Sequence, residues 1–412
     1  MATPLQQPRV SVFNPRLAAS LFLGFSSGLP LALTGATLQA WMVSEKVDLG
    51  VIGLFSLVGL PYTLKFVWAP LMDRFTVPLL GRRRGWIFLT QLALLLGIAA
   101  MAFCRPDGVS GMSLIAAVAV LVAFFSSSQD IVIDAYRTDV LYVGELGPGA
   151  AFNIMGYRIG MLVSGALALI LADHFSWRIV YLLMAGCMGI GMLATLLAPN
   201  PEKQGSPPQD LREAVLLPLV EFFKRKGAFE VLLFIVLYKI DVVIATALMT
   251  PFILSLGFSK TDIGAVTKGF GLIATIVGTL LGGIGVTRLG MKRSLWAFGL
   301  AQSISGVSFM VLAYMGHHYL SMVGAIAAEN ICSGMGTAAF SAFLMSQCDR
   351  RFTATQYALL TSLMALTRVI GGAPTGYLAK ALGWQSYFLF SIAASIPGLL
   401  LLTRYSKWKQ PN

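Results

Sequence analysis

The sequence has little charge and few of the residues that bind metals. Asp, Glu, Lys and Arg make up 12% of its 412 residues, whereas soluble domains have roughly a quarter. It contains only three histidines and four cysteines, and no CxxC pair, HExxH motif, P-loop or Rossmann fingerprint occurs. Zinc sites, a disulfide framework and nucleotide-dependent catalysis are therefore not expected. Because the polar loops are also too short for a catalytic domain, we expect neither an enzyme nor a bound metal or cofactor.

What remains is a largely apolar chain, in which 57% of the residues are hydrophobic. Twelve apolar runs reach the ~20 residues that a helix needs to cross the hydrocarbon core of a bilayer. They begin near residues 17, 50, 85, 112, 148, 177, 228, 261, 292, 319, 353 and 384. The only long polar segment, 199–227, follows the sixth run and includes a short amphipathic stretch. We predict an all-α membrane protein with six-helix bundles over 1–198 and 228–412, joined by this linker.

Basic residues gather in every second loop between the apolar runs. They include Arg9 and Arg16 before the first run, Arg74, Arg82, Arg83 and Arg84 after the second, Lys224, Arg225 and Lys226 before the seventh, and Arg404, Lys407 and Lys409 at the end. The positive-inside rule places these loops, the linker and both termini in the cytoplasm. The formal net charge of +12 thus comes largely from basic residues in short loops, where they set the orientation in the membrane. We therefore expect the lipid bilayer as a partner, and no nucleic acid.

The two halves of the chain resemble each other. DLGVIGLFSLVGLPY (48–62), which enters the second run, parallels KTDIGAVTKGFGLI (260–273), which enters the eighth. The sixth run opens with SWRIVYLLMAG and the twelfth with GWQSYFLFSIA, about 207 residues later. Two parallel six-helix repeats with a central linker are typical of the major facilitator fold. This pattern favours alternating access over a channel.

Nine charged residues fall inside the predicted spans, where each costs roughly 2.5 kcal/mol or more unless it is paired or hydrated. Salt bridges between helices are one explanation for any single residue. For the set as a whole, the excess of cations favours a polar central cavity for a substrate that bears carboxylates or phosphates. The predicted substrate contacts are Lys65, Gln129, Arg158, Lys239, Asp241, Lys268, Asn330 and Arg368.

Two carboxyl groups of the fourth run lie four residues apart, so Asp130 and Asp134 share one face of a helix. A carboxyl group at membrane depth exchanges its proton closer to neutral pH than one in water. We predict that Asp130 carries the coupling proton of a symporter. Asp134, and Glu329 in the tenth run, are the alternatives.

The loop after the second run carries a group of charges that is predicted to close the cytoplasmic side. Asp139 lies near the cytoplasmic end of the fourth helix, where a latch with arginines is favoured over a proton-carrying role. The predicted gate consists of Asp73, Arg74, Arg82, Arg83, Arg84 and Asp139.

Several segments together resemble the AmpG muropeptide permeases of Gram-negative bacteria. They are GFSSGLPLALTGATLQAWM (24–42), PLMDRF and GRRRGW (within 70–86), SSQDIVIDAYRTDVL (127–141), GYRIGMLVSG (156–165), VLYKIDVVIATALMTPF (236–252), AENICSGMGTAAFSAFLMSQC (328–348) and ATQYALLTSL (354–363). The resemblance runs from about residue 16 to residue 405. One departure from the general facilitator pattern is the insertion of FTVPLL between Asp73-Arg74 and the glycine-arginine run 81–84.

The resemblance implies a proton-driven importer in the inner membrane that works as a monomer. Its substrates would be N-acetylglucosaminyl-1,6-anhydro-N-acetylmuramic acid and its peptide-bearing forms, for peptidoglycan recycling and β-lactamase induction. Some members of the family continue past the twelfth helix with further hydrophobic segments, and we expect no role for such an extension here. An acetyl-CoA-type anion transporter and a general drug or metabolite exporter are the alternatives.

Overall fold

The computed structural model describes residues 14–47, 55–78, 80–105, 108–201, 210–225, 227–259, 262–349, 351–372 and 374–408. These residues form helices joined by short turns, and no strand occurs among them. The chain divides into two compact units. Unit 1 comprises residues 1–145, 152–216 and 348–358, and unit 2 comprises residues 146–151, 217–347 and 359–412.

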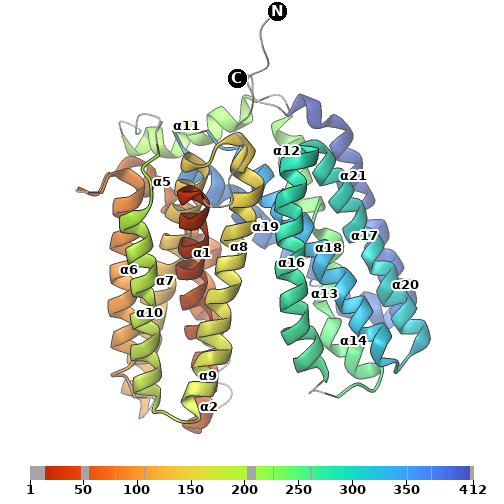
Figure 1. Cartoon of the computed structure of the whole chain (residues 1–412), viewed down its shortest axis with the longest axis horizontal. Coiled ribbons are helices and arrows are strands. Elements are labelled where there is room, and N and C mark those ends of the chain that lie inside the picture. The colour runs from red at the N-terminus through yellow and green to blue at the C-terminus, as the bar shows by residue number, and fades with distance from the viewer. Residues whose placement is uncertain are drawn as a thin grey trace, which may run out of the picture. The chain divides into compact units, whose positions relative to one another are not determined.

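Unit 1 contains long helices that lie side by side, with shorter helical pieces between them (Figure 1). In chain order its elements are α1 (Pro15–Leu33), α2 (Ala36–Ser44), η1 (Phe55–Gly59), α4 (Leu60–Leu64), η2 (Lys65–Val67), α5 (Ala69–Arg74), α6 (Arg82–Met101), α7 (Gly108–Val140), η3 (Val143–Glu145), most of α8 (Leu146–Leu162), the π-helical η4 (Val163–Leu167), α9 (Ala168–Ala172) and α10 (Trp177–Leu197).

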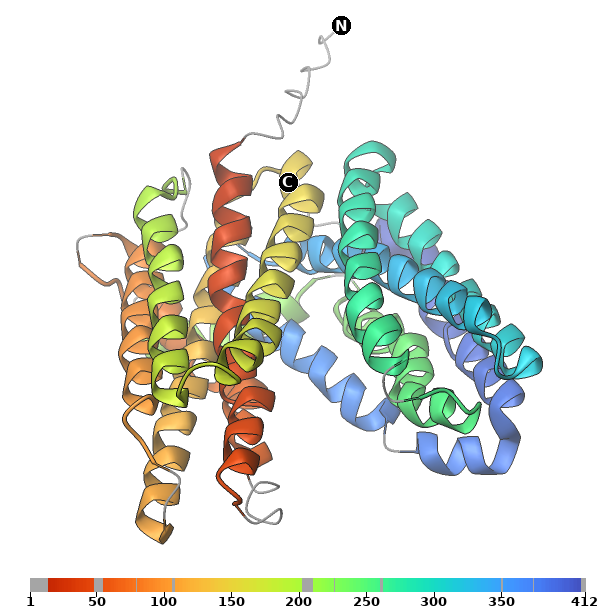
Figure 2. The same ribbon diagram turned by 60° about the horizontal axis from the view of Figure 1, so that its bottom comes forward.

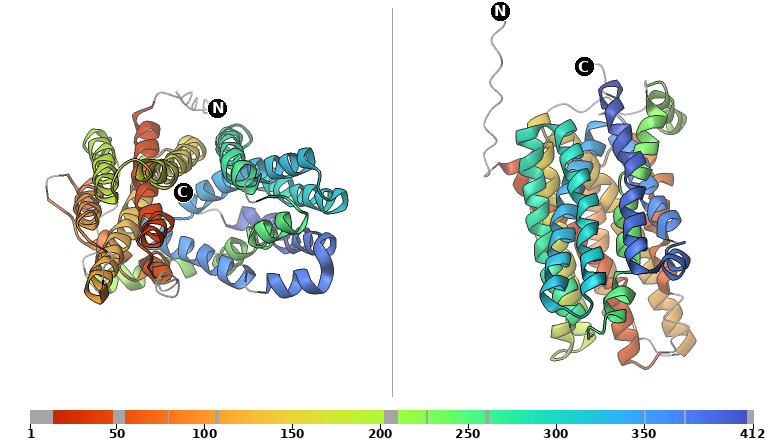
Figure 3. Two further views of the ribbon diagram at one scale, coloured as in Figure 1. Left: turned by 90° about the horizontal axis from the view of Figure 1, so that it is seen from below. Right: turned by 90° about the vertical axis from the view of Figure 1, so that its right-hand side faces the viewer.

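Unit 2 is built in the same manner, and its helices α16, α17 and α18 pack against one another (Figure 3). Helix α11 (Leu211–Phe223) begins in unit 1 and ends in unit 2, and α19 (Thr353–Gly372) does the same. The remaining elements are α12 (Ala228–Leu237), α13 (Ile240–Ala247), α14 (Met249–Ser255), the π-helical η5 (Ile263–Phe270), α16 (Gly271–Leu289), α17 (Met291–Met315), α18 (Tyr319–Ser346), α20 (Thr375–Ala394), α21 (Ile396–Leu401) and η6 (Leu402–Lys407).

Helix ends follow local sequence signals. The Asn14 side chain accepts a hydrogen bond from the Arg16 backbone N–H at 3.0 Å, so it caps α1, and proline occupies the first position of that helix. Between residues 55 and 74 the helix is broken into short pieces, because Pro61 and Pro70 lie in the first turns of α4 and α5. A proline has no backbone N–H to donate and its ring crowds the preceding turn, so it kinks or interrupts a helix. The second apolar run is therefore helical but interrupted.

Nine helical stretches of the described residues are long and apolar enough to cross a membrane. They are Pro15–Met42, Arg82–Met101, Ser110–Val140, Val143–Ala172, Trp177–Leu197, Ala228–Ser255, Ile263–Leu289, Met291–Met315 and Thr375–Lys407. The second, tenth and eleventh predicted spans correspond to the interrupted segment 55–74, to α18 and to α19, which fall outside this set. An all-helical membrane protein is confirmed, whereas the total of twelve spans stays a prediction.

Closely packed helix pairs in both units meet through glycines. Figures 1 and 2 show α1 beside α8, and a Cβ added at Gly28 would lie only 2.1 Å from the backbone oxygen of Tyr157 on that helix. In unit 2, a Cβ at Gly278 of α16 would lie 2.1 Å from the backbone oxygen of Ile331 on α18. Small residues let backbones approach closely, which is how membrane helices associate without a hydrophobic driving force between them.

Candidate transport site

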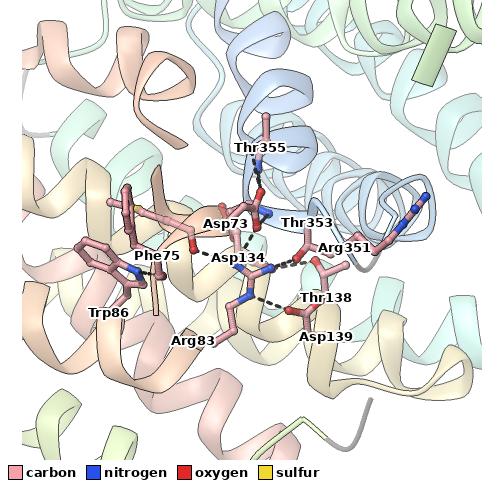
Figure 4. Close-up of polar contacts among 12 residues, drawn as sticks. Asp73, Phe75, Arg83, Trp86, Asp134, Thr138, Asp139, Arg351, Thr353 and Thr355 are labelled. Atoms are coloured by element: carbon pink, nitrogen blue, oxygen red, sulfur yellow. Dashed lines mark hydrogen bonds and ion pairs between the residues drawn. The ribbon is translucent and has the colours of Figure 1, made fainter. Parts of the chain in front are cut away.

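Unit 1 contains a group of buried ionic side chains that we call the arginine cluster, formed by Asp73, Arg83, Asp139, Thr353 and Thr355. Arg83 Nη1 lies 2.9 Å from Asp73 Oδ1, and Arg83 Nε donates to Asp139 Oδ2 at 2.7 Å. The Arg83 Nη2 group donates to the Thr353 hydroxyl. Figure 4 shows the guanidinium group between the two carboxyl groups. Residues from α5, α6, α7 and the first turn of α19 are thereby connected.

The carboxyl group of Asp73 also caps the N-terminus of α19. It accepts hydrogen bonds from the backbone N–H groups of Ala354 at 3.3 Å and Thr355 at 2.8 Å, and from the Thr355 hydroxyl at 2.7 Å. The first N–H groups of a helix have no partner within it and attract negative charge. Phe352, just before the helix, has no polar side chain for this purpose, so the acid of α5 supplies the cap from elsewhere in the chain.

The side chains of Arg83 and Asp73 are fully buried, each with 0% exposure. A buried charge without a partner is strongly destabilising, so one cation between two acids holds the cluster together. Arg82 is buried beside it and interacts electrostatically with Asp73 and Asp139. The cluster therefore suits a fixed electrostatic latch.

Two other arginines of the predicted gate have different surroundings. Arg84 donates to the backbone oxygens of Thr195 at 2.9 Å and Leu196 at 2.6 Å, so it caps the C-terminal end of α10. The guanidinium carbon of Arg74 lies 5.6 Å from the ring centroid of Phe75. The structure thus separates the gate into a central Arg83 and arginines that contact other groups.

Asp134 belongs to a second ionic group in unit 1. Its Oδ1 lies 2.9 Å from Arg137 Nη2, one helical turn further along α7. Arg137 also donates to Asn153 Oδ1 and to the Tyr357 hydroxyl, each at 2.9 Å. Asp134 is therefore held by a cation on its own helix.

Asp130 lies one turn before Asp134 and is half-buried. Its carboxyl group accepts a hydrogen bond from the Ser27 hydroxyl of α1 and interacts electrostatically with Lys65. The Tyr62 hydroxyl group also interacts electrostatically with Asp130. Asp130 and Lys65, two of the predicted site residues, are thus brought into one polar region.

Gln129, next to Asp130 in the sequence, faces the interior of unit 1. It is fully buried, and its Nε2 donates to the Ser26 hydroxyl at 3.1 Å. Gln91 Nε2 donates to the same hydroxyl at 3.1 Å, and Thr195 donates to Gln91 Oε1 at 2.7 Å. This network joins α1, α6, α7 and α10, which favours a structural role for Gln129.

Unit 2 contains a second polar group, the glutamine cluster, formed by Lys239, Asp241, Gln302, Ser305 and Glu329. Lys239 Nζ donates to Gln302 Oε1 at 2.8 Å, while Gln302 Nε2 donates to Asp241 Oδ1 at 2.9 Å. One amide side chain thus bridges a cation and an anion that do not touch. The Ser305 hydroxyl oxygen lies 2.7 Å from Glu329 Oε2.

The other predicted substrate contacts are less closely grouped. Asn330 Oδ1 accepts from the Thr275 hydroxyl at 2.8 Å, which joins α18 to α16. Arg158 is half-buried on α8. The side chains of Lys268 and Arg368 lie outside the described part of the structure.

One hollow of unit 1 is apolar. It has a volume of about 940 Å³ and lies between α7 and residues 55–68. Its walls carry hydrophobic side chains such as Leu57, Leu60 and Val120, which are exposed. It matches a lipid-facing surface better than a site for a charged, hydroxyl-rich substrate, so the polar clusters remain the better candidates.

Four residues of the two clusters, Gln302, Ser305, Thr353 and Thr355, were not predicted from the sequence. Gln302 is a neutral amide inside an apolar run, and its position there is the one signal that would have revealed it. Thr353 and Thr355 follow a polar turn at the start of a run, a pattern typical of helix N-termini. Among the described residues, no group of three or more His, Cys, Asp or Glu side chains is placed to hold a metal ion.

Membrane-length helices that carry buried charged clusters in both units define a multi-pass membrane protein of the transporter class. The family model of the Major Facilitator Superfamily matches residues 20–372 and, in a second match, 256–411. The anhydromuropeptide permease of Escherichia coli (strain K12) is 50% identical over 391 residues, which cover 94% of this chain and 79% of that protein. An uncharacterized protein of Haemophilus influenzae is 41% identical over 413 residues, covering 97% of each chain.

The chain therefore belongs to the Major Facilitator Superfamily and, within it, to the family of the AmpG-type anhydromuropeptide permeases. Among solved structures, a bacterial homologue of the iron transporter ferroportin in an outward-facing state superimposes with a TM-score of 0.69. That likeness covers 95% of this chain and 98% of the other at 14% identity, so it shows the fold alone. The predicted major facilitator fold and transporter class are confirmed.

Proposed function

We propose that the chain imports anhydro-muropeptides from the periplasm to the cytoplasm by proton-coupled alternating access. The 50% identity to the E. coli anhydromuropeptide permease, over 94% of the chain, carries this proposal. The cargo is N-acetylglucosaminyl-1,6-anhydro-N-acetylmuramic acid with or without its stem peptide. Its import would serve peptidoglycan recycling and the induction of β-lactamase.

The proposed topology has twelve spans in the inner membrane. Bundles over 1–198 and 228–412 are joined by the linker 199–227, and the linker and both termini lie in the cytoplasm. The basic residues of alternate loops support this orientation. The chain is proposed to work as a monomer and to need no cofactor besides the coupling proton.

The carboxylates of the stem peptide are proposed to bind the cations of the polar clusters. Lys65 in unit 1 and Lys239 in unit 2 are both half-buried and hold an ammonium group at membrane depth. Neither forms a close ion pair with another described residue, so its positive charge can attract a carboxylate of the cargo. Arg158, Lys268 and Arg368 complete the proposed set of anion partners.

Asp130 is the proposed carrier of the coupling proton. Asp134 is paired with Arg137, and because arginine stays charged, a proton on Asp134 would cost that ion pair. Asp130 instead accepts from the Ser27 hydroxyl, which can bond to the carboxyl group in either protonation state. A proton on Asp130 would also remove the attraction between its carboxylate and the ammonium group of Lys65. Lys65 would then be free to bind a carboxylate of the cargo, which links proton binding to cargo binding.

The test is uptake of anhydro-muropeptide by purified protein in liposomes under an inward proton gradient. We expect the wild type to concentrate the cargo and Asp130→Asn to bind it without gradient-driven uptake. The matched control is Asp173→Asn, an exposed aspartate in the turn after α9, which should transport like the wild type. Uptake that survives Asp130→Asn would move the proton to another carboxyl group. A wild type that takes up no muropeptide would refute the proposed cargo.

A further inference from the structure

Ser305 on α17 contacts two oxygen atoms at hydrogen-bond distance. Its hydroxyl oxygen lies 2.6 Å from the backbone oxygen of Gln302 and 2.7 Å from Glu329 Oε2 on α18. A serine hydroxyl has a single hydrogen to donate, and a backbone carbonyl can only accept. If the Ser305 hydrogen points to the carbonyl of Gln302, the short contact to Glu329 needs a hydrogen from Glu329 itself.

The neighbouring acid has the opposite surroundings. Asp241 Oδ1 accepts from the Val242 backbone N–H at 2.8 Å and from Gln302 Nε2 at 2.9 Å. Both donors are N–H groups, which stabilise a charged carboxylate. The Ser303 hydroxyl is more distant, at 3.2 Å from Asp241 Oδ2. No N–H group among the described residues donates to Glu329, so the negative charge belongs on Asp241 and the proton on Glu329.

The ammonium group of Lys239 balances that single charge. Its three hydrogens have neutral acceptors, which are Gln302 Oε1 at 2.8 Å, Thr337 Oγ1 at 3.0 Å and the Ser333 backbone oxygen at 3.5 Å. One cation and one anion joined through the Gln302 amide leave no second positive charge for an ionised Glu329. The side chain of Lys268 lies outside the described residues.

A small cavity lies between the two acids. Its lining includes Asp241, Gln302, Ser303 and Glu329, and its volume of about 10 Å³ is enough for one water molecule. Glu329 is 3% exposed, and its Oε1 atom has no hydrogen-bond partner among the described residues. An unpartnered buried oxygen beside a cavity of this size is where a bridging water is expected.

We propose that Glu329 binds a proton and, with Asp241 across the cavity, forms a second proton-binding site in unit 2, separate from Asp130. This site adds a second proton-binding group to the proposed proton coupling. Its role in transport rests on that proposed function, whereas the binding of the proton to Glu329 does not. Among the described residues, the charged groups that act on Glu329 are Asp241 and Lys239. A protonated Glu329 donates to Ser305, which satisfies both contacts of that hydroxyl group.

Infrared spectroscopy of the purified full-length protein, without substrate, tests the proton directly. At neutral pH we expect a C=O stretching band of a buried protonated carboxyl group that disappears in Glu329→Gln. The matched control is Glu145→Gln, because Glu145 is ion-paired with Arg16 at 2.9 Å and should contribute no such band. An identical carboxylic-acid band in wild type and Glu329→Gln would show that Glu329 is ionised and would overturn the proposal.

A second variant keeps the test valid if Glu329→Gln does not fold. Ser305→Ala retains the carboxyl group and removes its hydrogen-bond acceptor, so the band should shift to higher frequency. A band that stays at the same frequency would refute the Glu329–Ser305 hydrogen bond. Since no cargo is present, either result is independent of whether the chain transports muropeptides.

Discussion

In unit 1 Arg83 lies directly between two acids, 2.9 Å from Asp73 and 2.7 Å from Asp139. In unit 2 the cation Lys239 and the anion Asp241 are joined through the amide of Gln302, with no direct ion pair between them in the described part of the chain. The arginine cluster therefore pairs its charges by direct contact, whereas the glutamine cluster links its charges through a neutral side chain. Both arrangements are buried, but they differ in what they allow.

Arginine keeps its charge under all conditions that proteins meet, whereas lysine and carboxyl groups titrate when they are buried. The guanidinium of Arg83 cannot lose its proton, so the positive charge of the arginine cluster stays fixed between the two acids. The glutamine cluster can change its charge without moving, by gain or loss of a proton. We infer that the arginine cluster is a fixed latch and that the glutamine cluster is a site whose charge can vary.

The largest effect that tests this comparison is expected at Arg83. Arg83→Met leaves Asp73 and Asp139 buried without their cation, which should cost about 3–5 kcal/mol of stability or prevent folding. Lys239→Met should cost less, about 1–3 kcal/mol, because it removes hydrogen bonds to neutral acceptors while Asp241 can take up a proton. Thermal unfolding of the purified variants in detergent measures the difference.

Equal losses in these two variants would contradict the distinction between the clusters. Arg74→Met is the matched control for the loss of an arginine in the same region, since that side chain stacks over Phe75 rather than between acids. It should unfold at nearly the wild-type temperature.

Glycine-mediated helix contacts occur in both units, so the loss of stability on substitution of a glycine should be similar in the two. Gly28→Ala would place a methyl group 2.1 Å from the Tyr157 backbone oxygen, and Gly278→Ala would do the same at Ile331. We expect each to cost about 1–3 kcal/mol through helix displacement. Gly189→Ala is the control, because no atom outside its own turn of helix lies within 4 Å of the added carbon. Thermal unfolding in detergent again measures these changes, and a control as unstable as Gly28→Ala would remove the packing explanation.

Much of the fold could be predicted because membrane-length apolar runs leave few alternatives to helices. The runs at 85, 112, 177 and 292 coincide with long helices of the structure. The run near residue 50 was harder to predict in detail, because Pro61 and Pro70 divide it into short helical pieces. Local proline effects are visible in the sequence, but whether a helix bends or breaks depends on its neighbours.

The site was predicted less completely, because depth along a helix can be read from the sequence and direction cannot. Successive residues point about 100° apart, so Gln129 faces a buried network while Asp130 contacts Ser27. Their sequence surroundings give no means to distinguish them. Gln302 could not be predicted because a neutral amide in an apolar run has no distinctive signal. Its role depends on Lys239 and Asp241, which lie on either side of it only in the folded chain.

The smallest expected effect concerns a serine–acid pair at the surface of unit 2, the exposed counterpart of Ser305 and Glu329. The Ser259 hydroxyl donates to Asp262 Oδ2 at 2.6 Å, and the Ser259 backbone N–H donates at 2.9 Å. These hydrogen bonds hold the pKa of the Asp262 carboxyl below its usual value. Here the serine has no competing acceptor in the pair, so its hydrogen stabilises the charged acid.

A lowered pKa means that this helix cap stabilises the protein above the pKa of the unfolded chain. The contribution is lost as the pH falls through the lower pKa of folded Asp262. Asp262→Asn should therefore remove the pH dependence of amide protection in the first turn of η5, measured by hydrogen exchange corrected for intrinsic rates. Ser259→Ala should weaken the same protection at neutral pH. If the amide protection of the wild type does not change at acid pH, the charged carboxyl group of Asp262 does not stabilise this helix end. The proposed contrast between the exposed pair Ser259–Asp262 and the buried pair Ser305–Glu329 would then be wrong.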